Sequence, residues 1–523
     1  MFKLTADEIE KAIEAIKHHG YSAMLPEPSE WFDVIANQGD MRDYIAQLDL
    51  DTYEPFKPMK MFAPKNRANI RIVHLLHPQD LIIYTALTLI VKDDIEASRI
   101  TKKSKRVFSY RVDTQKDNRL YDARGAHEGY LDCLESKANK NYIKFVGIAD
   151  IADFYPRIYQ HRLENVIEAI ATSQRNVEIA RVLVKKFIAN LMGRNSYGIP
   201  VGPYASRVLA EAVLIDVDAY LHSNKIDFVR WVDDYNIFCK SEYEAQSTLF
   251  ALGEWLFLNH GLTLQSAKTK ILPVARYRDE VLSKPDDQLT DRDTAVAVFR
   301  DIVTGYDDEP DEEELDEETV QKILEELQGF DLLGMLNASI SDQTLVDYGI
   351  VRYVLSKLPR IPGAPDELKR QVLDLVIDNA DLLYPAAEHI AKYVVSFDHL
   401  SKSAKKSIAK KLLKPLKSKR NPPPTYYAMW MLWIFSTSED WNQIRDIIQL
   451  YQCSSSEVLK RYAALAVARG GSRAEALVIK DDYAAASDML KLSILKASNK
   501  LGKDERKHWK LANQVNGTLE KKI

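Results

Sequence analysis

Two acidic sites far apart in the sequence carry the side chains best suited to metal chemistry. Asp150 ends the strand-like run YIKFVGIAD, and Asp233-Asp234 lies between two apolar runs in FVRWVDDYNIF. Adjacent carboxylates repel each other, so the pair indicates either a hairpin turn, where Asp is common, or a metal site, where a cation offsets the repulsion. A strand-end Asp beside a hairpin-tip pair would bring three carboxylates to one sheet edge. Two Mg²⁺ ions about 3.5–4 Å apart require such a set for attack on a phosphate.

Two neighbouring segments could handle phosphate. YGIPVGPYAS places Gly198, Pro200 and Gly202 in a loop before a helix, which allows close approach of a ligand, although an ordinary loop-to-helix junction has the same pattern. GLTLQSAKTKIL presents Lys268 and Lys270. A lysine here could place a proton or positive charge near a leaving pyrophosphate, or could simply be a surface residue.

Three regions must position these residues. Residues 1–290 mix helical periodicity with short β-rich runs, residues 291–330 contain an acidic run, and residues 331–523 are a series of amphipathic helices. A chain of 523 residues is too long for one hydrophobic core, so several domains are expected. The helical rhythm of the last region indicates HEAT-like pairs, with an irregular helical bundle as the equal alternative.

Charge is unevenly distributed along the chain. The formal net charge is −5, but ten acidic residues fall within 306–320, so the remainder carries +5. This acidic block is most simply a solvated loop or an exposed helix face. Nine Lys or Arg residues fall within 402–427, which indicates either a nucleic-acid contact or a solvated helix end.

Targeting and redox signals favour a cytoplasmic protein. No apolar run is long enough to cross a bilayer, and the first twenty residues carry acids where a signal peptide would be apolar. Cys133, Cys239 and Cys453 lie far apart without metal-ligand spacing, as expected of reduced thiols.

The order of these segments resembles that of a reverse transcriptase. DIADFYPRIYQHRL, GIPVGPYAS, WVDD and GLTLQSAKTKI resemble the four palm motifs in turn, while NIRIVHLLHPQDLIIYTALTLIV and VFSYRV resemble the fingers. The resemblance covers roughly residues 60–275. It implies an α+β fold, namely a right-hand polymerase fingers-palm with an antiparallel palm sheet, followed by an all-α HEAT-like helical domain. It also implies a DNA polymerase, an RNA-directed DNA polymerase-like nucleotidyltransferase, that uses dNTPs with Mg²⁺ or Mn²⁺.

The resemblance assigns roles residue by residue. The metal set is expected at Asp150, Ile151, Asp233 and Asp234, and Lys268 resembles the family's lysine near the pyrophosphate.

The remaining assignments concern the nucleotide. Tyr155 matches the steric gate, whose aromatic ring under the sugar leaves no room for a 2′-hydroxyl, whereas Phe154 is expected in the core. Gly202 belongs to the expected nucleotide site. Arg71 and Arg111 lie in fingers-like segments and could hold the triphosphate or form structural salt bridges.

One departure from the usual motifs points to a particular group of reverse transcriptases. Val201 stands where the second motif usually has Gln, and with the helical second half this resembles the abortive-infection group of bacterial antiphage reverse transcriptases. That group implies homo-oligomers and template-independent DNA synthesis, with the product attached to a priming tyrosine. Tyr44 is one guess among 26 tyrosines. No RNase H acidic set, zinc-finger spacing or HNH motif is found in the sequence.

Two alternatives stay open. One is templated reverse transcription from an RNA partner, which would use the same active site. The other is a catalytically silent polymerase fold that binds nucleic acid or serves as a scaffold.

Overall fold

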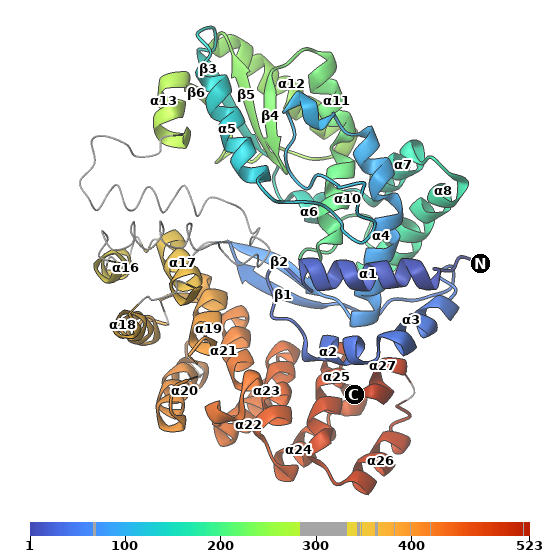
Figure 1. Cartoon of the computed structure of the whole chain (residues 1–523), viewed down its shortest axis with the longest axis vertical. Helices are drawn as coiled ribbons and strands as arrows, with labels where there is room; N and C mark the ends of the chain where they lie inside the picture. Colours follow the sequence, from blue (N-terminus) through green and yellow to red (C-terminus); the bar gives the residue numbers. More distant parts are fainter. Residues whose placement is uncertain are drawn as a thin grey trace. The chain divides into compact units, whose positions relative to one another are not determined.

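The chain divides into two compact units (Figure 1). The computed structural model describes residues 1–65, 69–282, 332–341, 346, 348–360, 365–380, 382–397, 399–418, 420–515 and 517–523. The first unit comprises Met1–Ala23, Gly39–Pro58 and Leu76–Lys284, and the second comprises Met24–Gln38, Met59–Leu75 and Pro285–Ile523. The acidic block at 306–320 lies outside the described residues.

A four-stranded sheet forms the centre of the first unit. Its strands are β3 (Phe145–Asp150), β4 (Phe228–Trp231), β5 (Asp234–Cys239) and β6 (Lys270–Pro273), in the order β4-β5-β3-β6. Every neighbouring pair is antiparallel, which confirms the antiparallel palm sheet expected from the sequence. All four residues of β4 are buried, as the apolar run that contains them predicts.

The β4–β5 hairpin carries the aspartate pair. Trp231 pairs with Asp234, so only Val232 and Asp233 connect the two strands. Val232 has a φ of +50°, in the left-handed region where two-residue hairpins usually place glycine. The hairpin tip expected from the sequence is therefore confirmed, with an unusual residue at its first position.

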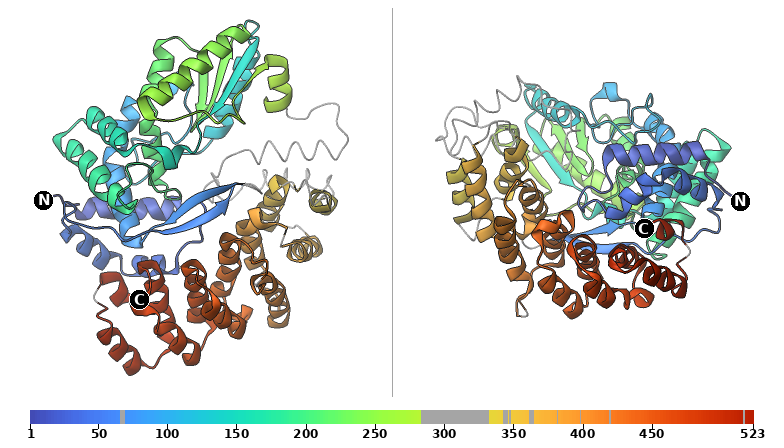
Figure 2. Two further views of the ribbon diagram at one scale, coloured as in Figure 1. Left: turned by 180° about the vertical axis from the view of Figure 1, so that it is seen from behind. Right: turned by 60° about the horizontal axis from the view of Figure 1, so that its bottom comes forward.

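Two helices pack on the sheet. Helix α12 (Glu242–His260) contacts β3, β5 and β6, and α5 (Ala126–Ala138) contacts β4 and β5. The view from behind in Figure 2 shows α12, in yellow-green, against the strands. A Cβ on Gly147 of β3 would lie 3.3 Å from Leu249 of α12, so the absence of a side chain there allows the close approach.

The first unit contains further helices, and several of them pack on the long α4, which is buried over most of its length. They are α1 (Ala6–His19), α3 (Gln38–Gln47), α4 (Pro78–Ser98), α6 (Phe154–Arg157), α7 (Gln160–Ile170), α8 (Gln174–Ala180), the π-helix η2 (Arg181–Ile188), α9 (Ala189–Leu191), α10 (Ala205–Val213), α11 (Ile215–Ser223) and α13 (Val274–Tyr277).

The second unit combines a β-hairpin with helices. The hairpin is β1 (Met59–Pro64) and β2 (Ile70–Leu75), and the helices are α2 (Ser29–Ala36), α16 (Leu332–Ser341), α17 (Tyr348–Lys357), α18 (Asp366–Asp378), α19 (Ala387–Val395), α20 (Lys402–Leu416), α21 (Thr425–Thr437), α22 (Ile444–Cys453), α23 (Glu457–Gly470), α24 (Arg473–Lys480), α25 (Asp488–Ala497), α26 (Lys503–Ala512) and α27 (Thr518–Lys522). The helical second half is thus confirmed over its described residues, while HEAT-like pairing stays a prediction. No helix in the described part of the chain is long and apolar enough to cross a membrane.

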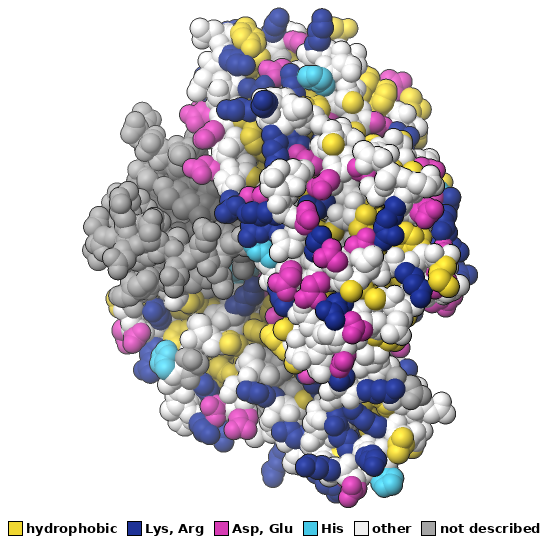
Figure 3. All heavy atoms as spheres, turned by 45° about the vertical axis from the view of Figure 1, so that its right-hand side comes forward, with side chains coloured by type: hydrophobic (Ala, Val, Ile, Leu, Met, Phe, Trp, Pro, Cys, Tyr) yellow, Lys and Arg dark blue, Asp and Glu magenta, His cyan; other side chains and the backbone are white. Residues whose placement is uncertain are grey.

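The basic patch predicted at 402–427 includes α20. Several of its lysines pair with carboxylates of the same unit, as Lys411 does with Asp378 at 2.7 Å and Lys417 with Asp446 at 2.6 Å. Figure 3 shows how Lys and Arg side chains alternate with Asp and Glu over one face of the molecule. The nucleic-acid contact at this patch stays a prediction.

A fully buried ion pair joins the N-terminal and C-terminal parts of the second unit. The Arg461 guanidinium donates to both carboxylate oxygens of Glu30, at 3.0 and 2.8 Å, and both side chains are 0% exposed. It also donates to the Ser493 hydroxyl at 2.7 Å. These bonds supply the partners that buried charges require.

Replacing Arg461 by leucine is expected to destabilise the protein strongly. Glu30 would be left buried without its counter-ion, which costs about 3–5 kcal/mol of unfolding free energy. Lys411→Leu removes an exposed pair of the same unit and should cost less than about 1 kcal/mol. Urea unfolding of both variants measures the difference, and equal losses would contradict the role of the buried pair.

Candidate active site

The sheet brings the predicted aspartates together. Asp150, the last residue of β3, pairs in register with Asp234, the first residue of β5. The Ile151 N–H donates to the Asp233 carbonyl at 3.2 Å, which joins the end of β3 to the hairpin tip. Residues separated widely in the sequence therefore meet at one sheet edge.

Burial and mutual repulsion set the protonation of this cluster. Burial raises the pKa of Asp234 to about 8, and the neighbouring charges of Asp233 and Asp150 act in the same direction, while Lys268 opposes them. One proton is therefore retained near neutral pH, since closely spaced carboxylates resist full ionisation.

Lys268 lies against this cluster. The turn before β6 is held to β3 by the Gln265 N–H, which donates to the Asp150 carbonyl at 2.7 Å. The Lys268 ammonium then reaches Asp150 Oδ2 at 2.5 Å. Burial lowers the Lys268 pKa, but the hydrogen bond to Asp150 and the surrounding acids outweigh it, so the pKa is raised overall. Lys270 instead pairs with Glu280 at 3.4 Å.

The donor set suits a hard divalent cation. Carboxylate oxygens are the ligands that Mg²⁺ and Mn²⁺ prefer, and Asp150, Asp233 and Asp234 supply them at one end of the sheet. Within the described ranges, no three His, Cys, Asp or Glu side chains are already arranged to hold an ion. The proton on Asp234 and the Lys268 ammonium reduce the net negative charge of the cluster. The residues fit a metal, while the set Asp150, Ile151, Asp233 and Asp234 stays a prediction.

Tyr155 lies beside the glycine loop. Its carbonyl accepts from the Ile199 N–H at 3.2 Å, and the Gly198 N–H donates to the Ile158 carbonyl at 2.8 Å. Gly198 has a φ of +89°, and a Cβ there would lie 3.1 Å from the Pro156 carbonyl, so glycine is required. Burial raises the pKa of the partly exposed Tyr155; Arg207 opposes this effect, and the charge of Asp233 adds to it. The tyrosine therefore lies within the electrostatic influence of Asp233.

Three other residues singled out in the sequence lie at different places in the fold. Phe154 is 2% exposed, which confirms the expected core position. Gly202 has a φ of +119°, and its carbonyl accepts from the Ala23 N–H at 3.1 Å. Arg71 lies on β2 of the second unit, so its nucleotide role stays a prediction.

Arg111 forms the structural ion pair that the sequence left as an alternative. It pairs with Glu96 at 3.2 Å and donates to the Val107 carbonyl at 3.1 Å and to the carbonyl of Ile100. The residue is 6% exposed, so these partners occupy the guanidinium. We therefore leave Arg111 out of the proposed nucleotide site.

Sequence reasoning missed the polar residues behind the hairpin. Ser109, Glu211, Asp218 and Arg230 are each buried and bonded to one another. The one available signal was an arginine inside the apolar run FVRW, because a charge in a buried strand requires partners.

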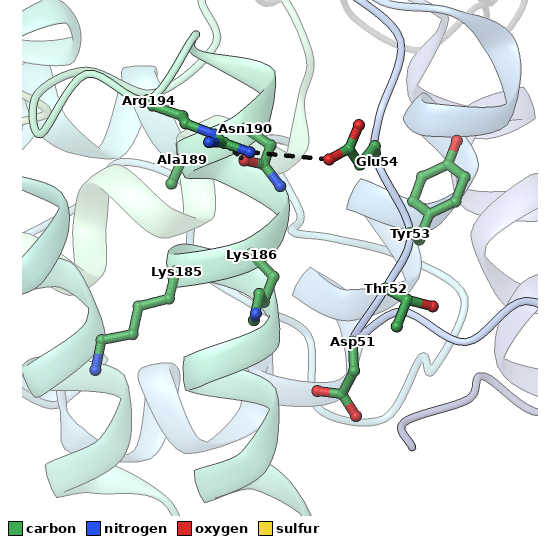
Figure 4. A pocket seen from close by; sticks show the side chains of 9 residues that line it. All are labelled: Asp51, Thr52, Tyr53, Glu54, Lys185, Lys186, Ala189, Asn190 and Arg194. Atoms are coloured by element: carbon green, nitrogen blue, oxygen red, sulfur yellow. Dashed lines mark hydrogen bonds and ion pairs between the residues drawn. The ribbon is translucent and has the colours of Figure 1, made fainter.

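A separate pocket of about 390 Å³ lies elsewhere in the first unit (Figure 4). Asp51 and Glu54 line one side, with lysines of η2 and Arg194 opposite them. Asp51 pairs with Arg181 at 2.6 Å, and Glu54 lies 3.8 Å from Arg194. None of the predicted catalytic residues lines this pocket.

Comparison with known families identifies the domain. Residues 64–295 match the family described as reverse transcriptase (RNA-dependent DNA polymerase). This part of the chain is a reverse transcriptase domain. Polymerases of this family generally use divalent metals. No curated protein matches the sequence.

Two solved telomerase structures show distant similarity. Telomerase from Candida albicans, in complex with a TWJ fragment of telomeric RNA, is 12% identical with a TM-score of 0.33, over 74% of this chain and 65% of that one. Apo telomerase from Candida tropicalis is 9% identical with a TM-score of 0.32, over 71% and 67%. The chain thus spans just under two thirds of the Candida albicans telomerase chain, and similarity at this level carries no conclusion about activity.

In the absence of divalent metal, Asp234→Asn is expected to stabilise the protein at alkaline pH. The carboxyl has a pKa of 3.8 in its ordinary state and about 8 in the fold. The unfolded chain therefore loses its proton first, and folding stability falls as pH rises between these values. The Asp234→Asn variant lacks this pH-dependent loss. Its stability relative to wild type should therefore increase as pH rises from 3.8 to about 8, and the difference should disappear at acidic pH.

Thermal unfolding in chelator across this pH range measures the effect. Asp153→Asn, at an exposed residue 3.7 Å from Arg157, is the control and should differ from wild type by a constant amount. A pH-independent difference for Asp234→Asn would contradict the raised pKa.

Proposed function

We propose that this protein is a metal-dependent DNA polymerase of the reverse-transcriptase class that acts in antiphage defence by abortive infection. The observation that supports this most is the pairing of Asp150 with Asp234, with Asp233 at the adjacent turn and Lys268 on Asp150. These residues lie inside the reverse transcriptase domain at 64–295.

Each residue has a defined part in nucleotidyl transfer. Asp150, Asp233 and Asp234 would hold Mg²⁺, or Mn²⁺, which lowers the pKa of an attacking hydroxyl and balances charge on the triphosphate. Lys268 stays an ammonium because its pKa is raised, so it can donate a proton or positive charge to the leaving pyrophosphate. Tyr155 limits the space beneath the sugar and so favours deoxynucleotides.

We further propose that synthesis needs no nucleic-acid template and starts on a tyrosine hydroxyl in a homo-oligomer. The support is the resemblance to the abortive-infection group, which rests on Val201 and on the helical second half. Val201 is 9% exposed and offers no polar side chain at a position where the family usually has Gln. Tyr44, partly exposed on α3, is one candidate primer.

The second candidate function is reverse transcription of an RNA template, which the family's description as an RNA-dependent DNA polymerase favours. A silent scaffold is the third. Clustered acids speak against a scaffold, because a purely structural site would gain from neutralising them.

Purified protein given Mg²⁺ and labelled dNTPs, without template, is expected to make DNA that stays attached to the polypeptide. Asp233→Asn should abolish incorporation because it removes a metal ligand from the hairpin tip. Asp153→Asn is the matched control, since Asp153 is exposed and pairs with Arg157, and it should keep wild-type activity. Denaturing gels before and after protease digestion detect the covalent label.

The outcomes separate the candidates. Incorporation only with added RNA, giving products of defined sequence, supports templated synthesis. If no template or primer yields product, the polymerase function is excluded. Protection from phage by the Asp233→Asn variant would favour the scaffold.

Tyr155→Ala is expected to admit ribonucleotides. Removal of the ring opens space for the 2′-hydroxyl. Because discrimination against an added hydroxyl by shape alone is about 10²-fold, the preference for dNTPs over rNTPs should fall by up to about that factor. Tyr155→Phe keeps the ring and should keep the preference for dNTPs. Competition between rNTPs and dNTPs measures the ratio, and an unchanged ratio in Tyr155→Ala would contradict the gate.

A further inference from the structure

A closed set of buried charges lies behind the aspartate hairpin. The Arg230 guanidinium donates to Glu211 Oε2 at 2.9 Å and to Asp218 through two bonds, at 2.9 and 2.5 Å. Arg99 donates to the same oxygen of Glu211 at 2.7 Å. All four side chains are 1% exposed or less. Burial favours the neutral form of Glu211, but Arg230 and Arg99 overcome this and lower its pKa, so the carboxylate is ionised.

This buried set holds the residue that precedes the aspartates. The Val232 N–H donates to the Ser109 hydroxyl at 2.9 Å, and Ser109 in turn donates to Glu211 Oε1 at 2.5 Å. The Arg230 guanidinium donates to the Val232 carbonyl at 2.7 Å. The main-chain N–H and carbonyl of Val232 are therefore both hydrogen-bonded to side chains of the buried set.

The path of residues 106–109 explains how Ser109 reaches the turn. Val107 forms a parallel bridge with Arg230, supported by bonds from the Arg230 N–H to the Arg106 carbonyl at 2.7 Å and from the Phe108 N–H to the Arg230 carbonyl at 3.3 Å. In a parallel pair, residues the same number of positions after a bridge lie beside each other. Ser109 and Val232 each lie two residues after the Val107–Arg230 bridge, so they are neighbours.

Val232 needs such support. Its φ of +50° lies in the left-handed region, which β-branched residues disfavour, and the side chain is 4% exposed. Unfavourable backbone geometry persists only where the surroundings determine it strongly. A hairpin free to relax would change the direction of the following residues, Asp233 and Asp234.

We propose that Ser109 and Arg230 are positioning residues that hold the Val232–Asp233 turn in the conformation that sets Asp233 and Asp234 opposite Asp150. This inference rests on the proposed polymerase function. Neither residue touches the reacting atoms, so their effect appears in the placement of the carboxylates rather than in nucleotide binding. Ser109 is the more testable of the two, because Arg230 keeps both acidic partners when the hydroxyl is removed.

Ser109→Ala is expected to lower kcat by roughly 10- to 100-fold, the loss expected of small misplacements in an active site, while the KM for dNTP changes less than about twofold. The matched control is Ser493→Ala. Ser493 is also a fully buried hydroxyl on an Arg–Glu pair, but it belongs to the second unit. The Ser493→Ala variant should lose about as much thermal stability as Ser109→Ala and keep the wild-type kcat.

A double-mutant cycle tests the link to the turn. Glycine adopts positive φ without steric cost, so Val232→Gly reduces the need for support. In the Val232→Gly background, Ser109→Ala should then cost at least about threefold less in kcat than in wild type. Equal losses in both backgrounds would overturn the proposed role in holding Val232.

The remaining outcomes are distinct. An inactive wild type refutes the polymerase function itself, whereas an active wild type with unchanged kcat in Ser109→Ala refutes only the positioning role. If Ser109→Ala does not fold, Ser109→Cys replaces it, since the thiol keeps a weaker hydrogen-bonding group of similar size. A folded variant whose kcat falls while its loss of thermal stability is no larger than that of Ser493→Ala supports the proposal, and wild-type kcat overturns it.

Discussion

The site depends on an arrangement that electrostatics alone would oppose, namely like charges held face to face by backbone pairing. The β3–β5 register places Asp150 directly opposite Asp234, and the two-residue β4–β5 connection places Asp233 next to Asp234. The sheet's hydrogen bonds and apolar packing hold the carboxylates together; burial, with the neighbouring charges of Asp233 and Asp150, raises the pKa of Asp234, and Lys268 pairs with Asp150. The divalent cation that we propose for this site would offset the crowded negative charge.

Much of this could be predicted from the sequence. Short apolar runs located β3, β4 and β5, and the strand ends placed Asp150 and the Asp233-Asp234 pair at one edge. Those inferences depend on a local pattern, since buried strands appear in the sequence as short apolar runs. The motif order then indicated the reverse transcriptase domain that the family comparison identified.

What could not be predicted depends on packing between distant segments. Arg111 lies in a fingers-like stretch, yet only the fold shows Glu96 beside it. Residues 101–125 contain little regular structure, so no periodicity reveals that Ser109 reaches Val232. Arg230 was visible within FVRW, but its two carboxylate partners come from α10 and α11. Val232 follows a strand-like pattern, and its positive φ arises from a tight connection that pattern analysis cannot detect.

The interleaving of the two units means that no single cut separates them. Helix α2 packs on α27, and strand β1 packs on α21, although both segments come from the first 75 residues. A fragment ending near residue 290 would keep Trp31, Val34, Met61 and Val73 but lose the C-terminal helices of their unit. Such a fragment would expose apolar surface and leave Glu30 without Arg461, so residues 1–290 are not expected to be stable as a separate protein.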